Sequence, residues 1–448
     1  MKPHKVKKIQ ESNRLYHFLR NYVDRSLRQA YRDIEYYGRE QLPKDAAIIY
    51  APNHSNALMD ALIVLTIDKQ QKVFVARADI FKNPVIAKLL NFFKIMPIMR
   101  IRDGVEEVKK NQEIIDKSVD VLLDGVPFCI LPEGTHRAQH SLLPLSKGIF
   151  RIALQSQQLL QDKKDVCIVP VGIEYGNYFR YHSNVHIQLG TPINIRQFQE
   201  NHPELQPAEL INELRTHLTQ AMRQHILYLP DDDKYQASYE LTALVAEATQ
   251  KELRAENPSL SPTRLRFLAN QKTAARIATL RASQPEAMDA LLDNCQRIHE
   301  ERIRQKISLA SMVPACPWRK RGINYLLSLI TFPYLAGCML AVSPIVGIGE
   351  ALFKYVMKDK AFHNSVRFVL HLVLWPLLLV IYGSILFCNL PWVWALLTLT
   401  AVLPTPIFAQ DCYQNIRLFL SDCKWSRNAS LRRMIRQVRS AYSDLLHI

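Results

Sequence analysis

The chain has 448 residues, a length that allows one large folded core and a second region. Its 57 lysines and arginines exceed its 41 aspartates and glutamates, and the formal net charge of +16 favours an anionic partner such as a lipid surface or a phosphorylated small molecule. RNA-binding motifs are absent, so no nucleic-acid partner is expected. The eight cysteines form no Cys-x-x-Cys pair, which fits a reducing compartment, and residues 1–8 lack the apolar core of a signal peptide.

An amphipathic helix is predicted near the N-terminus, within residues 1–40. Apolar side chains recur at helical spacing from Leu15 to Ile34, and arginine and aspartate occupy the other face. Such a helix either packs on a core or lies on a membrane surface.

Residues 41–205 alternate short β-rich runs with helical patterns. The predicted strands are Ala47–Ala51, Val73–Ala76, Ile95–Arg100, Pro127–Leu131, Val166–Ile173 and Val185–Leu189. Helices are predicted between them, among others at Val105–Leu123 and Ile149–Leu160. This alternation predicts an α/β domain with a mixed, mostly parallel sheet flanked by helices.

Residues 206–318 have a polar, helical pattern, which Pro258 and Pro262 divide into two parts. At the other end of the chain, residues 411–448 form a basic tail that contains seven arginines and lysines spread from Arg417 to Arg439.

Two apolar segments lie between these regions. Segment 319–353 carries Pro333 and Pro344, and segment 366–410 is long enough for two membrane helices joined by a turn at 389–391. Basic residues flank both segments. If all of these flanks stay on one side of a membrane, the first segment is re-entrant and the second is a transmembrane hairpin. Buried core helices are the alternative.

A motif for acid–base chemistry follows the first strand of the α/β domain. Asn53 and His54 come directly after the strand, and Asp60 follows. A histidine paired with a carboxylate can act as a general base, because the carboxylate fixes the tautomer and stabilises the imidazolium. Taken alone, the segment equally fits a helix cap followed by an unrelated aspartate.

Three further blocks each combine a strand with the residues at its end: Lys94–Arg100 with Arg102, Leu131–Arg137 with Lys147, and Val169–Gly172. In the first, Arg100 and Arg102 are placed to hold a phosphate. In the second, a turn exposes Glu133 beside the backbone donors of Gly134. The third has Pro170 within a strand. Read alone, the blocks also fit surface arginines, an ordinary turn and an edge strand.

In this order and spacing, the four blocks resemble the signature blocks of the glycerophospholipid acyltransferases, over about residues 30 to 200. The resemblance implies that His54 deprotonates the acceptor hydroxyl and that Asp60 is its partner. It implies a block for the acyl donor at Pro170. The substrate-binding residues expected on this basis are Asn53, Arg100, Arg102, Glu133, Gly134, Thr135, Arg137, Lys147 and Pro170.

The sequence departs from the family pattern in three places. Five residues separate His54 from Asp60 where four are commoner, and an offset of six positions turns a regular helix by about 240° and rises about 9 Å. His54 must therefore lie in a loop before the helix. This wider spacing resembles the branch that acts on glycerol 3-phosphate and dihydroxyacetone phosphate. Lys94 replaces a usual glycine, and His136 displaces Arg137 by one position.

Other kinds of site are disfavoured. Glu133, His136 and His140 have spacings that could hold a metal, but they begin in a Pro-Glu-Gly turn and there is no His-Glu-x-x-His, so no metal is expected. The Gly-x-Ser-x-Gly motif of serine hydrolases and the phosphate-binding P-loop are absent. No cofactor is expected besides an acyl donor.

The sequence therefore predicts a membrane-bound O-acyltransferase of phospholipid (phosphatidic acid) biosynthesis. It would move an acyl group from acyl-CoA or acyl carrier protein to glycerol 3-phosphate or dihydroxyacetone phosphate, with backbone N–H groups near His54 or Gly134 binding the oxyanion. Lysophosphatidate is the alternative acceptor, and a non-catalytic scaffold that binds lipid headgroups is an alternative of another class. The protein is expected to be integral to the membrane, with its catalytic domain on the cytoplasmic face.

Overall fold

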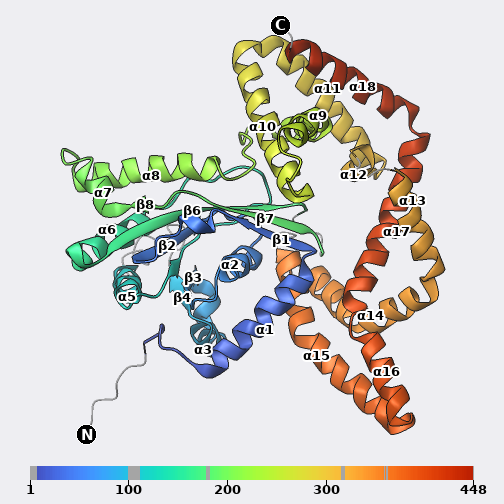
Figure 1. Ribbon diagram of the computed structural model, residues 1–448, viewed down its shortest axis with the longest axis horizontal. Coiled ribbons are helices and arrows are strands. Elements are labelled where there is room, and N and C mark those ends of the chain that lie inside the picture. The colour runs from blue at the N-terminus through green and yellow to red at the C-terminus, as the bar shows by residue number, and fades with distance from the viewer. Residues whose placement is uncertain are drawn as a thin grey trace. The chain divides into compact units, whose positions relative to one another are not determined.

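The chain forms two compact units in a computed structural model that describes residues 8–98, 111–177, 182–313, 318–357, 359 and 362–446 (Figure 1). The first unit comprises residues up to 179 together with Asn184–Ile226. The second comprises Leu227–Ile448 together with residues 180–183. Each unit is described by itself.

An eight-stranded sheet forms the centre of the first unit. Its strands are β1 (Asp33–Tyr37), β2 (Ala46–Pro52), β3 (Val73–Arg77), β4 (Ile95–Ile98), β5 (Phe128–Cys129), β6 (Asp165–Tyr175), β7 (Asn184–Leu189) and β8 (Ile193–Asn194). The order is β1-β7-β6-β2-β5-β3-β4, with β8 also pairing β6. Only the pairs of β6 with β7 and β8 are antiparallel, so the predicted mixed, mostly parallel sheet is confirmed.

Helices cover both faces of this sheet. They are α1 (Arg14–Ala30), α2 (Leu58–Leu65), α3 (Pro84–Phe92), α5 (Asn111–Leu123), α6 (Gly148–Leu160), α7 (Ile195–Glu200) and α8 (Pro207–Arg223), with short 3₁₀ turns η1 (Arg39–Gln41), η2 (Ala78–Lys82) and η4 (Gln161–Lys163). The chain moves one way along the sheet from β2 to β4 and returns from β4 to β6. Because such crossovers are right-handed, α2 and α3 lie on one face and α5 and α6 on the other.

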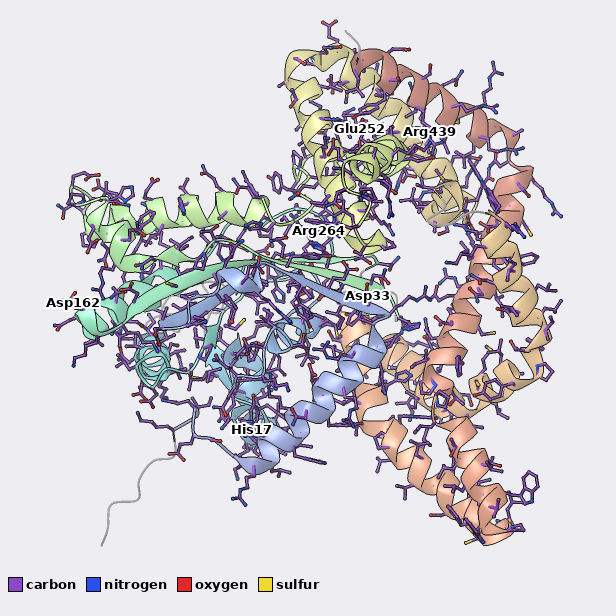
Figure 2. All side chains as sticks on the ribbon, in the orientation of Figure 1. His17, Asp33, Asp162, Glu252, Arg264 and Arg439 are labelled. Atoms are coloured by element: carbon purple, nitrogen blue, oxygen red, sulfur yellow. The ribbon has the colours of Figure 1, made fainter. Side chains whose placement is uncertain are left out.

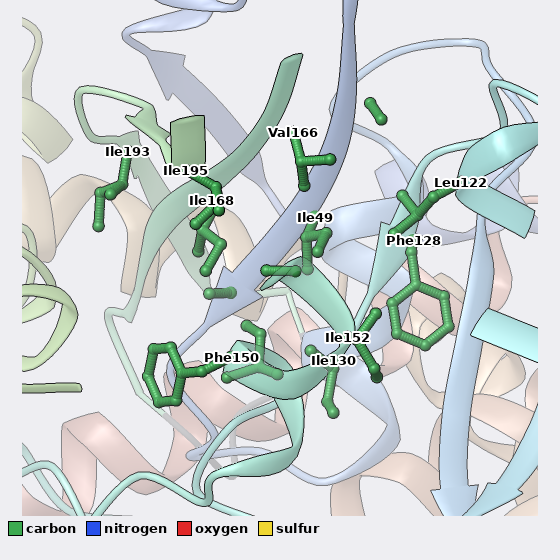
Figure 3. Close-up of a cluster of buried hydrophobic side chains, with 14 of the residues drawn as sticks. Ile49, Leu122, Phe128, Ile130, Phe150, Ile152, Val166, Ile168, Ile193 and Ile195 are labelled. Atoms are coloured by element: carbon green, nitrogen blue, oxygen red, sulfur yellow. The ribbon is translucent and has the colours of Figure 1, made fainter. Parts of the chain in front are cut away.

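Alternate residues of β2 serve these two faces. Ile49 lies in the buried cluster with Phe128 of β5 and Ile152 of α6, which Figure 3 shows together with Val166 of β6. Tyr50 points to the opposite face, where its hydroxyl donates to Asp68 beyond α2 at 3.1 Å. The long buried runs of β2 and β6 follow from this double coverage, since a strand covered on both faces has no solvent side.

The limits of the α/β unit differ from those expected. The N-terminal helix ends at Ala30, and Ile34 belongs to β1, the edge strand that pairs with β7. At the other end, α8 follows the expected limit of 205, yet its buried Leu214 and Leu218 belong to the sheet's own core. Hydrophobic periodicity predicts a helical or extended segment but does not show which core the segment joins. Both limits of the α/β unit therefore differ from the expected residues 41 and 205.

Helices form the described part of the second unit. They are α9 (Tyr235–Glu256), α10 (Pro262–Ser283), α11 (Pro285–Arg304), α12 (Leu309–Met312), α13 (Trp318–Ile330), α14 (Phe332–Tyr355), α15 (His363–Asn389), α16 (Trp392–Val402), α17 (Thr405–Arg427) and α18 (Ala429–Leu446). The expected basic tail is helical: α18 buries Leu431 and Ile435 in one core with α9 and α11, so only its other face is exposed.

Two of these helices, α14 and α15, are long and apolar enough to cross a membrane. The re-entrant break expected in 319–353 is not at Pro344, because α14 continues through that residue. A proline leaves the carbonyl four residues earlier without its helical donor, and here Ser343 Oγ donates to Leu340 O at 2.7 Å. With 24 residues, α14 is about 36 Å long, more than the hydrocarbon thickness of about 30 Å.

In the second apolar segment, α15 ends at Asn389, where the turn was expected, and α16 returns. With 11 residues, α16 spans only about 16 Å, too short to cross a bilayer by itself. It continues into α17 after a break with a 45° bend, and the pair is long and apolar enough for one broken span or a re-entrant loop.

Candidate active site

The carboxyl ends of three neighbouring strands carry the predicted site. After β2 the chain passes to α2 on one face of the sheet, and after β5, which pairs with β2, it passes to α6 on the other. Neighbouring strands whose loops leave to opposite faces form a topological switch point, the usual ligand-binding place in an open α/β sheet. The loop after β2 carries His54, and the turn after β5 carries Glu133.

His54 and Asp60 meet at this edge. His54 Nδ1 lies 2.9 Å from Asp60 Oδ2, with 16% of the histidine side chain exposed and none of the aspartate. The pair can form because α2 begins only at Leu58, so Asp60 lies in its first turn and His54 in the preceding loop, as the spacing requires. Ala57 turns the chain with a φ of 47°, a conformation that costs a non-glycine residue about 1–3 kcal/mol.

Asp60 holds this loop together through both carboxylate oxygens. Oδ2 also accepts the backbone N–H groups of Ser55 and Asn56, at 2.9 and 2.7 Å. Oδ1 accepts the hydroxyl of Tyr175, at the end of β6, at 2.7 Å. Among the described residues, His54 is the sole partner of Asp60 that can carry a positive charge. The arrangement fixes the imidazole by Nδ1 and leaves Nε2 to meet a substrate hydroxyl.

Asn53 ties the His54 loop to β6. Its side-chain Oδ1 accepts the N–H of Ile173 at 2.7 Å, and its Nδ2 donates to the carbonyl of the same residue at 3.1 Å. Asn53 was predicted to bind substrate, but its amide is buried and both of its polar atoms bond to this backbone. In the structure the Asn53 amide therefore positions the His54 loop against β6.

Glu133 joins the two loops of the site. Its Oε1 accepts the backbone N–H of His54 at 2.6 Å, and its Oε2 accepts that of Leu143 at 2.8 Å. Burial raises the pKa of Glu133 to about 7, against the lowering effect of these two donors and of His54. The carboxylate thus acts as a bridge between loops rather than as a group turned outward to substrate.

The turn that follows β5 places the remaining residues of the third block. Gly134 is exposed and has a φ of 66°, which suits glycine, and Thr135 is half-buried beside it. Arg137 donates its backbone N–H to His54 O at 3.1 Å and a guanidinium N–H to Ser141 Oγ at 2.8 Å. Lys147 is exposed at the start of α6.

The backbone donors expected for the oxyanion are already engaged. The N–H of His54 bonds to Glu133, and the N–H of Gly134 bonds to Leu131 O at 3.1 Å. These two amides therefore organise the loops of the site.

Pro170 lies in an interior strand, so the edge-strand alternative does not hold. Its missing N–H falls where β6 changes partner, from β8 at Ile168 to β7 at Val171, so the sheet loses no ladder bond. Gly172 of the same block has a packing role, because a Cβ there would lie 1.8 Å from His225 O. Pro170 is buried and pairs with Ala51 of β2.

Two groups of candidate residues remain, the two arginines of the second block and the residues considered for a metal. Arg100 and Arg102 lie outside the described residues. Of the residues considered for a metal, Glu133 is bound to backbone donors, and His140 pairs with Glu174 at 2.9 Å. The ring of His136 lies 5.3 Å from that of His54 at a tilt of 59°.

Sequence reasoning missed Tyr175 and Glu174. Both follow Ile173 directly, so three consecutive residues at the end of β6 each bind a loop of the site. The rule that carboxyl ends of neighbouring parallel strands meet at one edge could have found them, had the predicted strand Val166–Ile173 been extended by two residues.

Known proteins resemble this part of the chain. The family model described as Acyltransferase matches residues 33–174. The chain is 30% identical over 122 residues to the 1-acyl-sn-glycerol-3-phosphate acyltransferase BAT2, chloroplastic, of Brassica napus, which covers 27% of this chain and 33% of that protein. The chain thus matches about a third of the length of this curated relative.

A solved structure is also similar, that of the 1-acyl-sn-glycerophosphate (LPA) acyltransferase PlsC from Thermotoga maritima. It shares 19% identity at a TM-score of 0.34 and covers 47% of this chain and 79% of that one. The matched residues 33–174 contain the His54 loop and the Glu133 turn. The resemblance to the glycerophospholipid acyltransferases that the four blocks predicted is thus confirmed for this part of the chain.

Proposed function

We propose that this protein is an O-acyltransferase that moves a fatty acyl group from a thioester to a hydroxyl of a phosphorylated glycerol. The observation that carries the proposal is the 2.9 Å contact between His54 Nδ1 and the fully buried Asp60. It provides an oriented base at the carboxyl edge of the sheet, within the residues that match the acyltransferase family model.

The reaction needs one proton to be moved twice. His54 Nε2 takes the proton of the acceptor hydroxyl while the oxygen attacks the thioester carbonyl carbon, and Asp60 stabilises the imidazolium. As the tetrahedral intermediate collapses, the carbon–sulfur bond breaks and the imidazolium returns the proton to the leaving thiolate. The products are an ester and a thiol, and no acyl-enzyme, metal or cofactor takes part in these steps.

Phosphate recognition is assigned to the cationic side chains of the site region. Arg137 and Lys147 follow the Glu133 turn, and Ser146, just before Lys147, donates to Pro132 O at 2.7 Å, which holds this segment against the turn. Arg100 and Arg102 complete the proposed set by family resemblance. The donor, acyl-CoA or acyl carrier protein, is assigned to the side of Pro170 on the same ground.

For the acceptor we favour 1-acylglycerol 3-phosphate, because the Brassica napus relative is named for that activity. A second candidate is glycerol 3-phosphate or dihydroxyacetone phosphate, favoured by the six-residue offset between His54 and Asp60. The helices α14 and α15 support membrane association, and we assign the α/β unit to the cytoplasmic face, where these donors occur.

The test is an acyltransferase assay of the purified chain in vesicles, with each acceptor and with both kinds of donor. Transfer to 1-acylglycerol 3-phosphate well above transfer to the other two acceptors is expected. Preference for glycerol 3-phosphate or dihydroxyacetone phosphate would reverse the choice of acceptor. Headgroup binding without transfer to any acceptor would favour the non-catalytic scaffold.

A further inference from the structure

The α/β unit exposes a continuous group of large apolar side chains. All nine residues of α3 are at least partly exposed, although most of them are apolar. The exposed fraction reaches 74% at Val85 and, on α1, 69% at Phe18. We call this group the α3 surface; its members are Leu15, Phe18, Ile80, Val85, Ile86 and Leu89.

Ring contacts join α1 to α3. The rings of Tyr16 and Phe92 lie 6.5 Å apart, and Lys94 Nζ lies 5.4 Å from the Tyr16 ring. Figure 1 shows α3 beside the first turns of α1, the part of the helix where His17 is labelled in Figure 2. Leu15 and Phe18 are exposed on α1, which packs against α3 through Tyr16 and Phe92. Contiguous apolar exposure of this kind marks an interaction site.

The charge around the α3 surface is mostly positive. Arg14, Lys82 and Lys88 are exposed at its rim. From Ala78 to Ile98 the chain has one acidic residue, Asp79, and its carboxylate is paired with Arg77 at 2.5 Å. Apolar side chains bordered by lysines and arginines are the pattern of a helix lying in the interface of an anionic bilayer, where the cationic ends reach the headgroups.

The position of the α3 surface relates it to the active site. β5 pairs in parallel with both β2 and β3, so these three strands end at the same edge of the sheet. The His54 loop follows β2 at this edge, and η2, which contains Ile80, follows β3 there. The two helices α14 and α15, if inserted, would keep the surface at a high local concentration of lipid.

We propose that the α3 surface docks the α/β unit onto an anionic bilayer, with Leu89 and Val85 among the acyl chains and Lys82 and Lys88 at the headgroups. The sheet edge that carries His54 is then presented to the lipid phase. If the proposed acyl transfer holds, apolar substrates reach His54 from the bilayer without crossing water.

A fluorescent probe on Leu89 tests the docking in the full-length chain. The variant Leu89→Cys is labelled with an environment-sensitive dye after Cys316, Cys388 and Cys423 are replaced by serine; the remaining cysteines are buried, namely Cys129, Cys167, Cys295, Cys338 and Cys412. Nanodiscs of phosphatidylglycerol and of phosphatidylcholine are compared. In phosphatidylglycerol, a nitroxide on the lipid chain should quench the probe about twofold or more above its quenching by aqueous iodide.

Glu204→Cys is the matched control, since Glu204 is exposed just before α8, which packs in the core on the other face of the sheet. Its probe should respond to iodide and not to the lipid nitroxide. The double variant Lys82→Glu and Lys88→Glu should reduce quenching of the Leu89 probe in phosphatidylglycerol to the level seen in phosphatidylcholine.

Three results would overturn the proposal. Equal iodide quenching at Leu89 and Glu204 would place the α3 surface in water. A Leu89 probe shielded from both quenchers would mean that protein, such as a second copy of the chain, covers it. If the lysine substitutions had no effect on quenching, docking would not require anionic lipid. Since none of these readouts depends on turnover, an inactive protein that docks would refute the proposed function alone.

Discussion

Asp60 in the α/β unit and Glu240 in the helical unit are both fully buried carboxylates that lie beside a histidine. Glu240, on α9, lies 3.2 Å from His299 Nδ1 and also binds Arg302, whose Nε and Nη2 reach its two oxygens at 2.8 and 3.0 Å. Within the described residues Asp60 contacts no arginine: its other partners there are two backbone N–H groups and a tyrosine hydroxyl.

This difference separates a structural pair from one suited to catalysis. Burial raises the pKa of Glu240, but the hydrogen bonds from His299 and Arg302 and the charge of Arg302 outweigh it, so the pKa lies below its usual range. Arg302 already neutralises the carboxylate. The partners of Asp60 orient it without neutralising it, so its charge stays available to an imidazolium at His54.

The largest effect is expected from removing His54. His54→Ala should lower acyl transfer by roughly 10²–10⁴-fold while the protein stays folded and membrane-associated, because the base is lost. His54→Asn is a second test that keeps a donor for Asp60. His299→Ala is the matched control on the other carboxylate and should leave transfer intact. The measurement is the initial rate in vesicles, alongside the thermal midpoint of each variant.

Near-normal transfer by both His54 variants would remove the general base from the mechanism. If His299→Ala lowered transfer as strongly as His54→Ala at equal stability, the distinction between the two carboxylates would also fail.

Glu240→Gln should lower the stability of the protein and leave the rate of acyl transfer unchanged, which is the reverse of His54→Ala. It leaves the guanidinium of Arg302, which is 11% exposed, without its counter-charge, and breaking a buried pair in this way costs about 3–5 kcal/mol of stability. His299→Ala should cost only about 1 kcal/mol, because Arg302 still binds the carboxylate. Chemical denaturation measures both values, and the rate per folded molecule should not change. Equal destabilisation by the two variants would contradict the role given to Arg302.

The sequence predicted the parts of this picture that depend on local pattern. The apolar runs located β2, β3 and β6, and the six-residue offset correctly required a loop between His54 and Asp60. β1 was missed because its apolar residues also continue the helical period of α1.

The contacts of the site itself were beyond local pattern. Tyr175 meets Asp60 across 115 positions, through the register of β6 on β2. The resemblance assigned Glu133 to the substrate, and the sequence does not show the backbone donors of His54 and Leu143 that converge on its carboxylate.

Glu133 is a third carboxylate to compare with Asp60 and Glu240. Its described partners are two backbone N–H donors, without a paired cation. Burial raises its pKa from 4.5 to about 7, so between these values the folded state holds more protons than the unfolded state. Stability should therefore fall as pH rises from about 4.5 to about 7, by about 3 kcal/mol in all. In Glu133→Gln this contribution disappears, so the difference between the two unfolding curves should depend on pH. Parallel curves from pH 4.5 to 8 would contradict the raised pKa.

Tyr175→Phe should have the smallest effect and the most specific one. It removes the single donor to Asp60 Oδ1 among the described residues and keeps the ring, so kcat should fall about tenfold, as for a lost hydrogen bond of about 1.4 kcal/mol, with KM nearly unchanged. The fall in kcat is expected because the Asp60 carboxylate is then held less firmly beside His54.

Tyr31→Phe is the control, because the buried Tyr31 ring lies 6.0 Å from that of Tyr175 and the change also removes a hydroxyl. Its effect should be confined to the thermal midpoint. Since the neutral donors of Asp60 distinguish it from Glu240, a Tyr175→Phe enzyme with unchanged kcat would mean that the backbone N–H groups of Ser55 and Asn56 suffice to orient the carboxylate. The hydroxyl would then serve packing at the end of β6 alone.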